Sequence, residues 1–219
     1  PEPRAVIDQL ASMGLPMAQP LLKLRAECPG AGPREMELAL DQWWFKEARS
    51  RVQESRGGNA LLSDALDAEI DLINLLTMLR FVHAPAECPV ARKRVGSDDL
   101  SRYFVGPGRL ALGLLTRATT QQTLEAAIEI LSRTPYGPPL SAGMVAYLRS
   151  GRLSDFERHL RGFRLRWMAG LMARDPLGIG VPLGYSALKA SEVANLRWVA
   201  QGINLGLEAD AIKAEMEFA

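Results

Sequence analysis

Apolar residues recur three or four positions apart through most of this chain, and this spacing constrains its fold more than any other feature. The period places side chains along one face of an α-helix, whereas a half-buried β-strand needs alternation. No sustained alternating run of β-branched and aromatic residues occurs. The clearest helical segment runs from Leu61 to Val82, and its apolar positions are Leu62, Leu66, Ile70, Ile73, Leu76 and Leu79. We therefore predict an all-α fold.

Further helices are predicted where the same period lies between turn-forming residues. Over 34–56 the apolar side chains form one stripe, and Gly57 with Gly58 supplies a permissive backbone that ends the helix. The other predicted helices cover residues 124–131, 154–173, 183–203 and 208–218. Loops rich in proline and glycine at 84–96 and 106–108 separate the two halves. We expect one helical lobe over 1–98, whether complete or cut short, and a second over 99–219.

Two pairs of polar residues match the capping box, in which a hydroxyl side chain and a residue three positions later satisfy backbone N–H groups at a helix start. Thr119 with Gln122 precedes one predicted helix, and Ser154 with Glu157 opens the next. We expect both pairs to cap their helices.

Composition excludes several classes of protein. The chain has 219 residues, of which 47% are hydrophobic, and its formal net charge is +1. Such a chain buries enough apolar surface to offset its ordering entropy, so disorder is excluded. The near-neutral balance lacks the broad basic field of a nucleic-acid binder. No apolar stretch is long enough to span a bilayer, so we expect no transmembrane segment.

Residues that carry catalysis or bind metals are scarce. Cys28, Cys88, His83 and His159 give no four-ligand zinc spacing and no disulfide framework. The carboxylates lie on predicted helical faces beside Arg and Lys, as solvated ion pairs do. The glycines of 178–184 lack the spacing of a phosphate-binding loop, and no Gly-Lys-Ser or Gly-Lys-Thr occurs. We predict no catalytic, metal-binding or cofactor-binding residue and no direct nucleotide binding.

The second half of the chain resembles the first when it is shifted by about 120 positions. Residues 37–43 then align with residues 157–163, and both segments share an acid, a leucine and an aromatic residue. A second alignment pairs Asp71, Asn74 and Leu75 with Glu192, Asn195 and Leu196. Two matches in the same order favour duplication of a helical lobe. On a helix the acid and the Asn share one face, where they bind a neighbouring backbone or side chain.

One predicted helix carries a basic stripe. Arg158, Arg161 and Arg164 recur every three residues, with Arg166 nearby. A solvated helix face explains this pattern, and so does a docking surface for an acidic partner, because guanidinium groups bind carboxylates bidentately. Nucleic acid is disfavoured because no exposed aromatic residues are interleaved with the arginines.

Several motifs in a fixed order resemble a known family. They are Asp71-x-x-Asn74-Leu75, Gly106-Pro107-Gly108-Arg109-Leu110, Thr134-Pro135-Tyr136, Asp175-Pro176-Leu177-Gly178 and Glu192-x-x-Asn195-Leu196-Arg197. The set resembles the C subunit of the V/A-type rotary ATPases of bacteria and archaea, a relative of the d subunit of the eukaryotic V-ATPase. The resemblance covers nearly the whole chain and is best over 104–212. Gln201, which stands where the other repeat has Arg80, departs from it, as does the segment after His83.

The resemblance implies a fold of three similar helical lobes arranged as a funnel. By this resemblance we expect only the second and third lobes here, which agrees with a repeat seen twice and with a sequence that begins at Pro1 without a Met. The resemblance also implies a non-catalytic socket on the cytoplasmic side of the membrane. This socket links the shaft, made of the D and F subunits, to the membrane rotor ring and transmits torque for ATP-coupled proton or sodium transport. No cofactor is implied.

The basic groups are then candidates for partner contacts, namely Arg92, Lys93, Arg94, Arg158, Arg161, Arg164 and Arg166. An alternative is a helical-repeat adaptor unrelated to ion transport. A small helical enzyme is a further alternative, and it would need a perturbed His83 or a buried carboxylate pair in a pocket.

Overall fold

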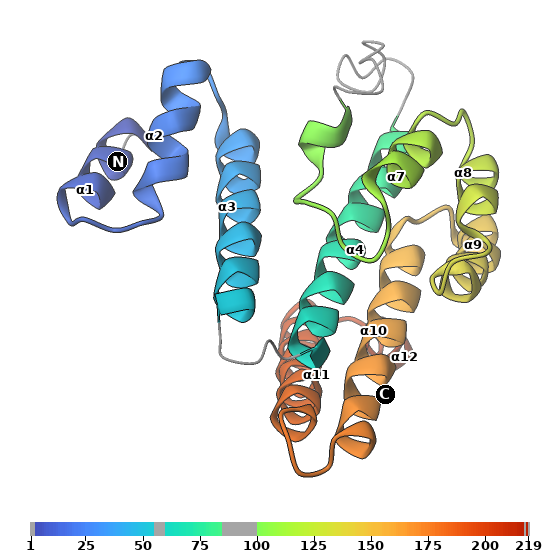
Figure 1. Cartoon of the computed structure of the whole chain (residues 1–219). Helices are drawn as coiled ribbons and strands as arrows, with labels where there is room; N and C mark the ends of the chain where they lie inside the picture. Colours follow the sequence, from blue (N-terminus) through green and yellow to red (C-terminus); the bar gives the residue numbers. More distant parts are fainter. Residues whose placement is uncertain (1–2, 55–59, 85–99, 217, 219) are drawn as a thin grey trace.

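The computed structural model describes residues 3–54, 60–84, 100–216 and 218. Every regular element in these residues is helical, which confirms the predicted all-α fold (Figure 1). The elements are α1 (Pro3–Ser12), α2 (Ala18–Glu27), α3 (Pro33–Glu54), α4 (Ala60–His83), the 3₁₀ turn η1 (Ser101–Tyr103), α7 (Leu112–Thr119), α8 (Leu124–Leu131), α9 (Gly137–Ser150), α10 (Ser154–Arg174), α11 (Gly180–Asn204) and α12 (Ala209–Glu215).

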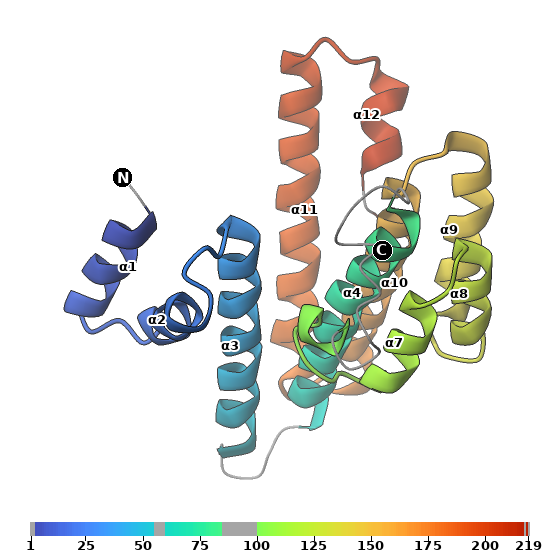
Figure 2. The same cartoon turned by 90° about the horizontal axis from the view of Figure 1, so that it is seen from above.

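Four long helices form two antiparallel hairpins, α3 with α4 and α10 with α11 (Figures 1 and 2). Their bounds lie close to the predicted ranges, because long segments with a clear apolar period are the easiest to recognise. The predicted stop of the first long helix at Gly57 lies outside the described residues. At about 1.5 Å per residue, the 21 residues of α10 and the 25 of α11 span about 31 and 37 Å.

Prolines lie in the first turns of two helices. Pro138 and Pro139 occupy the start of α9, a helix that the sequence did not predict. Pro182 lies in the first turn of α11, which begins three residues before the predicted start. The first N–H groups of a helix have no acceptor within it, so proline removes no hydrogen bond there.

Both predicted capping boxes are wrong. The N-cap of α8 is Thr123, whose Oγ1 accepts a hydrogen bond from the Ala126 N–H at 3.2 Å. Thr119 lies in the last turn of α7, and its hydroxyl donates to the carbonyl of Leu115 at 2.8 Å. At the start of α10 the N-cap position is Leu153, without a side-chain hydrogen bond, and Glu157 pairs instead with Arg161. Capping depends on which residue leaves the helical backbone conformation, and the spacing alone does not show that.

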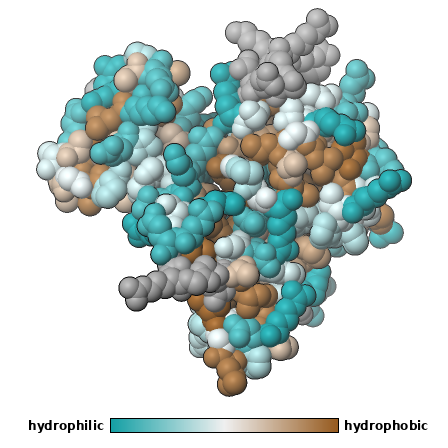
Figure 3. Space-filling view, viewed as in Figure 1, coloured by the Kyte–Doolittle hydropathy of each residue, from teal (hydrophilic) through white to brown (hydrophobic). Residues whose placement is uncertain are grey.

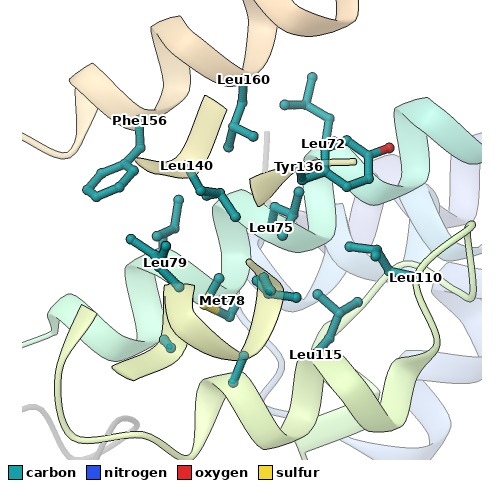
Figure 4. Packing of buried hydrophobic residues seen from close by; sticks show 14 of the residues in the cluster. Leu72, Leu75, Met78, Leu79, Leu110, Leu115, Tyr136, Leu140, Phe156 and Leu160 are labelled. Carbon is teal, nitrogen blue, oxygen red and sulfur yellow. The ribbon is translucent and has the colours of Figure 1, made fainter. Parts of the chain in front are cut away.

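The main apolar core surrounds α4. Side chains along one face of this helix meet α7, α8, α9 and α10 (Figure 4). The largest of its fully buried side chains are Leu75, Met78, Leu79, Leu115, Leu131, Leu140, Phe156 and Leu160. The cluster therefore joins residues from both sides of position 98, and the division into lobes 1–98 and 99–219 stays a proposal.

The order of helices repeats along the chain. Helices α1 to α4 comprise two short helices and a long hairpin, and α8 to α11 have the same order. The first residues of α3 and α10, Pro33 and Ser154, are 121 positions apart. In both units the short pair and the second long helix lie on opposite sides of the first long helix (Figures 1 and 2). The duplication inferred from sequence thus has a counterpart in the arrangement of helices.

Candidate functional site

Asn74 on α4 holds the loop that leads into α7. Its Nδ2 donates to the carbonyl of Gly106 at 2.8 Å, and its Oδ1 accepts from the Val105 N–H at 3.0 Å. The side chain is completely buried. The amide thus replaces the pairing that this loop backbone would otherwise find in water.

Asp71, one turn earlier on α4, holds the other end of the loop. Its Oδ1 accepts from the Leu110 N–H at 3.1 Å, and its Oδ2 accepts from the Tyr136 hydroxyl at 2.9 Å. We call Asp71, Asn74 and the loop 105–110 the α4 clasp. It ties together α4, the loop and the residue just before α9, which lie far apart in sequence.

Glycine allows the loop to lie against α4. A Cβ on Gly108 would lie 2.3 Å from Asp71 Oδ1 and 2.8 Å from the carbonyl oxygen of Asp67, well inside contact distance. Gly106 has φ of +152°, which L-residues rarely adopt. The Gly-Pro-Gly sequence is therefore required by close approach at one glycine and by backbone conformation at the other.

Burial raises the pKa of Asp71, and hydrogen bonds from the Leu110 amide and the Tyr136 hydroxyl oppose the shift. Burial and the neighbouring Asp71 charge also raise the pKa of Tyr136, so Tyr136 stays a protonated donor. Both carboxylate oxygens of Asp71 and the hydroxyl of Tyr136 are thus engaged in hydrogen bonds that hold α4, the loop 105–110 and the turn before α9 together. The geometry suits positioning of the backbone.

The second copy of the motif has different surroundings. Glu192 on α11 is exposed and pairs with Lys189 at 2.6 Å, and Leu196 is 63% exposed, whereas its counterpart Leu75 is fully buried. Asn195 is buried beside a shallow cavity of about 350 Å³ that Met216 and Phe218 also line. The two copies share a sequence pattern and a helix position, but only the copy on α4 lies in the main core.

The basic stripe on α10 is largely engaged within the molecule. Arg158 donates to the Ala214 carbonyl at 2.6 Å and to Asp155 at 2.8 Å, which fastens the C-terminal segment to α10. Arg161 pairs with Glu157 on the same helix. Arg164 reaches Glu69 on α4 at 2.8 Å.

Arg166 is exposed and lies near His159. The candidates Arg92, Lys93 and Arg94 lie outside the described residues. The structure therefore brings three of the four stripe arginines into intramolecular contacts and leaves Arg166 on the surface.

The two histidines lie on different helices, His83 at the end of α4 and His159 on α10. Nδ1 of His83 lies 3.0 Å from the hydroxyl oxygen of Tyr147. The pKa of His159 is lowered by partial burial and by the charge of Arg158, against an opposing effect of Asp155. Among the described residues no three His, Cys, Asp or Glu side chains are grouped as metal ligands. None of the helices in these residues combines the length and apolar character of a bilayer-crossing segment.

Sequence reasoning missed several polar ties around the α4 clasp. Arg49 on α3 binds both Asp67 at 2.6 Å and the carbonyl of Pro107 at 2.7 Å. Gln42 donates to the carbonyls of Arg102 and Phe104. The three backbone carbonyls that Arg49 and Gln42 bind lie 58 to 62 positions away, and side-chain periodicity gives no signal for such contacts. The one available signal was the Gly-Pro-Gly turn that Asn74 and Asp71 hold.

Comparisons with known proteins place these features in a family. The model of the ATP synthase (C/AC39) subunit family matches residues 2–215. The C subunit of the A-type ATP synthase of Halobacterium salinarum is 31% identical over 190 residues, which cover 83% of this chain and 49% of the relative. That of Haloferax volcanii is 33% identical over 153 residues, covering 69% and 40%.

The corresponding protein of Haloquadratum walsbyi is 27% identical over 180 residues, which cover 82% of this chain and 48% of the relative. The chain thus spans about half the length of the curated relatives it matches. No solved structure gives a significant match. Because the family model covers nearly every residue, from the first short helix through the C-terminal segment, the chain belongs to the ATP synthase (C/AC39) subunit family.

Proposed function

We propose that this chain is a non-catalytic connecting component of a rotary ATP synthase. In this role it is a socket that joins the shaft of the D and F subunits to the membrane rotor ring and transmits torque for ATP-coupled ion transport. It lies on the cytoplasmic side and is held at the membrane through the assembly. The observation that carries the proposal is the family match over residues 2–215. The match does not favour an adaptor unrelated to ion transport.

The packing of α4 supports a mechanical role. A torque-transmitting part must resist relative movement of its helices. Arg164 ties α10 to α4, and Asp71 and Asn74 tie the loop 105–110 to the same helix. These side chains are engaged in structural contacts, and the long hairpins supply extended stiff elements.

The exposed basic residues are the proposed electrostatic contacts. Arg158 and Arg164 already have intramolecular partners, so they are weaker candidates than Arg166. Arg92, Lys93 and Arg94 stay candidates from sequence alone. A contact at Arg166 would be salt-sensitive, because exposed charges are screened over about 8 Å at physiological ionic strength.

Binding measurements test the proposal. We expect the purified chain to bind either a reconstituted complex of the D and F subunits or the rotor ring in nanodiscs. Arg166→Glu should weaken that binding and reduce its salt dependence, whereas Arg117→Glu on exposed α7 surface should not. Absence of binding to both partners, for a chain whose helical content is intact, would overturn the proposed role.

A further inference from the structure

After α11 the chain turns back on the α10–α11 hairpin through Gly206. This glycine has φ of +67°, the left-handed conformation that ends many helices, and the Leu207 N–H donates to the Gly202 carbonyl at 2.9 Å. Figure 2 shows α12 beside the end of α11. We call residues 207–216, which comprise α12 and its flanking residues, the strap. A single left-handed glycine thus separates the strap from α11.

The strap buries very little of its surface. No residue of α12 is buried, and only Ile212, Glu215 and Met216 of the strap are partly covered. A helix of seven residues is not stable in water on its own. Segments with few buried apolar contacts open at a lower free energy than the whole fold. We therefore expect the strap to be the least stable part of this hairpin.

The strap is held on one side by arginines from the start of α10. Arg158 donates to the carbonyl of Ala214 at 2.6 Å, one of the carbonyls that a helix end leaves without a partner. Arg152 lies 3.8 Å from the carboxylate of Glu215. These contacts lie at the surface, where salt screens charges. The attachment of the strap therefore depends on charged groups that solvent can reach.

An apolar contact holds the strap to α11. The two chains approach so closely at Gly202 that an added Cβ would lie 2.4 Å from Cγ1 of Ile212. At the opposite end of the hairpin, the turn between α10 and α11, Leu177 is fully exposed, and Figure 3 shows hydrophobic surface at this lower end of the molecule. The strap thus covers one end of the hairpin, where its contact with α11 needs a residue without a side chain.

The internal repeat shows a firmer version of the same attachment. Beyond α4, the segment 100–110 returns to its helix, is held by the buried amide of Asn74, and has four apolar residues that are 2% to 8% exposed. Asn195 is the equivalent of Asn74 on α11, and it lines a shallow cavity together with Met216 of the strap. The first returning segment is built into the core, whereas the strap lies outside it. The strap can therefore open without disrupting the core.

We propose that the strap opens as a unit about Gly206 while α10 and α11 stay folded. In the closed state Arg152 and Arg158 are used within the chain. In the open state Arg152 loses Glu215, Arg158 keeps only Asp155, and the side of α11 at Gly202 is uncovered. The strap is thus a switch for the basic start of α10. This proposal does not depend on the role in an ATP synthase.

Native-state hydrogen exchange of the purified chain tests the switch. We expect the amides of 212–216 to exchange about 100-fold or more faster than those in the middle of α11, because they exchange through local opening. Sodium chloride at about 1 M should accelerate them further and leave α11 unchanged. Arg158→Ala removes the bond to Ala214 and should accelerate exchange of 212–216 by about tenfold. Arg166→Ala, on an exposed arginine of the same helix, is the matched control and should change neither region.

A second variant opens the strap without removing a charge. In Gly202→Ala the new Cβ requires Ile212 to move, so the strap should exchange faster although α11 gains helix propensity. Gly170→Ala on α10, where an added Cβ meets nothing within 4 Å, is its control. Strap amides that exchange as slowly as those of α11 would overturn the proposal. The same conclusion would follow if both Arg158→Ala and Gly202→Ala left the strap unchanged, or accelerated the strap and α11 equally.

Discussion

Tyr136 donates its hydroxyl hydrogen to Asp71 across 65 positions of the chain, with 2.9 Å between the two oxygens. Asp71 is completely buried, and Tyr136 is only 5% exposed. This contact joins α4, around which the main core is built, to the turn before α9. It is also the point at which burial of a carboxyl group is compensated by protein donors.

Removal of the hydroxyl should therefore be costly. Tyr136→Phe keeps the ring in the core but leaves Asp71 Oδ2 without its donor. We expect a loss of about 1–3 kcal/mol in the free energy of unfolding, the cost of an unsatisfied buried polar group. Urea denaturation measures it. Tyr185→Phe, on a tyrosine that is 55% exposed, is the control and should change stability little.

The raised pKa of Asp71 predicts a pH dependence of stability. A folded-state pKa above the unfolded value of about 3.9 means that the folded protein binds the Asp71 proton more tightly than the unfolded chain does. The contribution of this proton to the free energy of unfolding is therefore complete below the unfolded pKa and is lost as pH rises through the folded pKa. Asp71→Asn has no such titration. The stability of the unmodified chain relative to Asp71→Asn should fall as pH rises from about 4 towards neutrality. Parallel pH profiles for the two proteins, from urea titrations, would contradict this expectation.

Asn74→Ala should release the loop 105–110. Two backbone groups, the Val105 N–H and the Gly106 carbonyl, lose their partner in a buried site. At about 1–3 kcal/mol per unsatisfied group, we expect a loss of roughly 2–4 kcal/mol. Hydrogen exchange of the Val105 amide should accelerate more than that of amides in α10. Asn204→Ala, at the exposed end of α11, is the matched control and should leave the loop protected.

Two glycine substitutions should act in opposite directions. Gly108→Ala places a Cβ against Asp71 and the backbone of Asp67, and we expect a loss of about 1–3 kcal/mol because fixed neighbours must move. In α10, a Cβ on Gly170 would meet nothing within 4 Å. Gly170→Ala should stabilise the protein by about 0.5–1 kcal/mol through helix propensity. Thermal unfolding of both variants checks the pair, and equal effects would show that close approach at Gly108 does not matter.

The long helices were predicted well from the sequence, whereas the helix caps and α9 were not, because the two depend on different kinds of information. The long helices were predictable because the apolar period of α3, α4 and α10 persists over many turns. Thr119 and Ser154 were assigned as caps from spacing, yet capping depends on local backbone geometry that spacing does not encode. Helix α9 was missed because Pro138 and Pro139 are typical of loops and are equally compatible with the first turn of a helix.

The candidate site was predicted only in part. The pattern of acid and Asn on one helix face identified Asp71 and Asn74, and the expectation that such a pair binds a neighbouring backbone agrees with the contacts of the α4 clasp. The sequence did not show that Tyr136 would be a partner or that Arg158 and Arg164 would be engaged internally. The two residues in each of these contacts are 56 positions apart for Arg158, 65 for Tyr136 and 95 for Arg164.

The sequence by itself determined the helical fold, the repeat and the family, because apolar period and motif order are properties of the linear chain. Only the tertiary structure decided that the motif on α4 is enclosed in the core while its copy on α11 faces outward. The same residue types have opposite environments, since burial depends on which other helices pack over a face. That arrangement is set by long-range packing, which no local pattern in either copy contains.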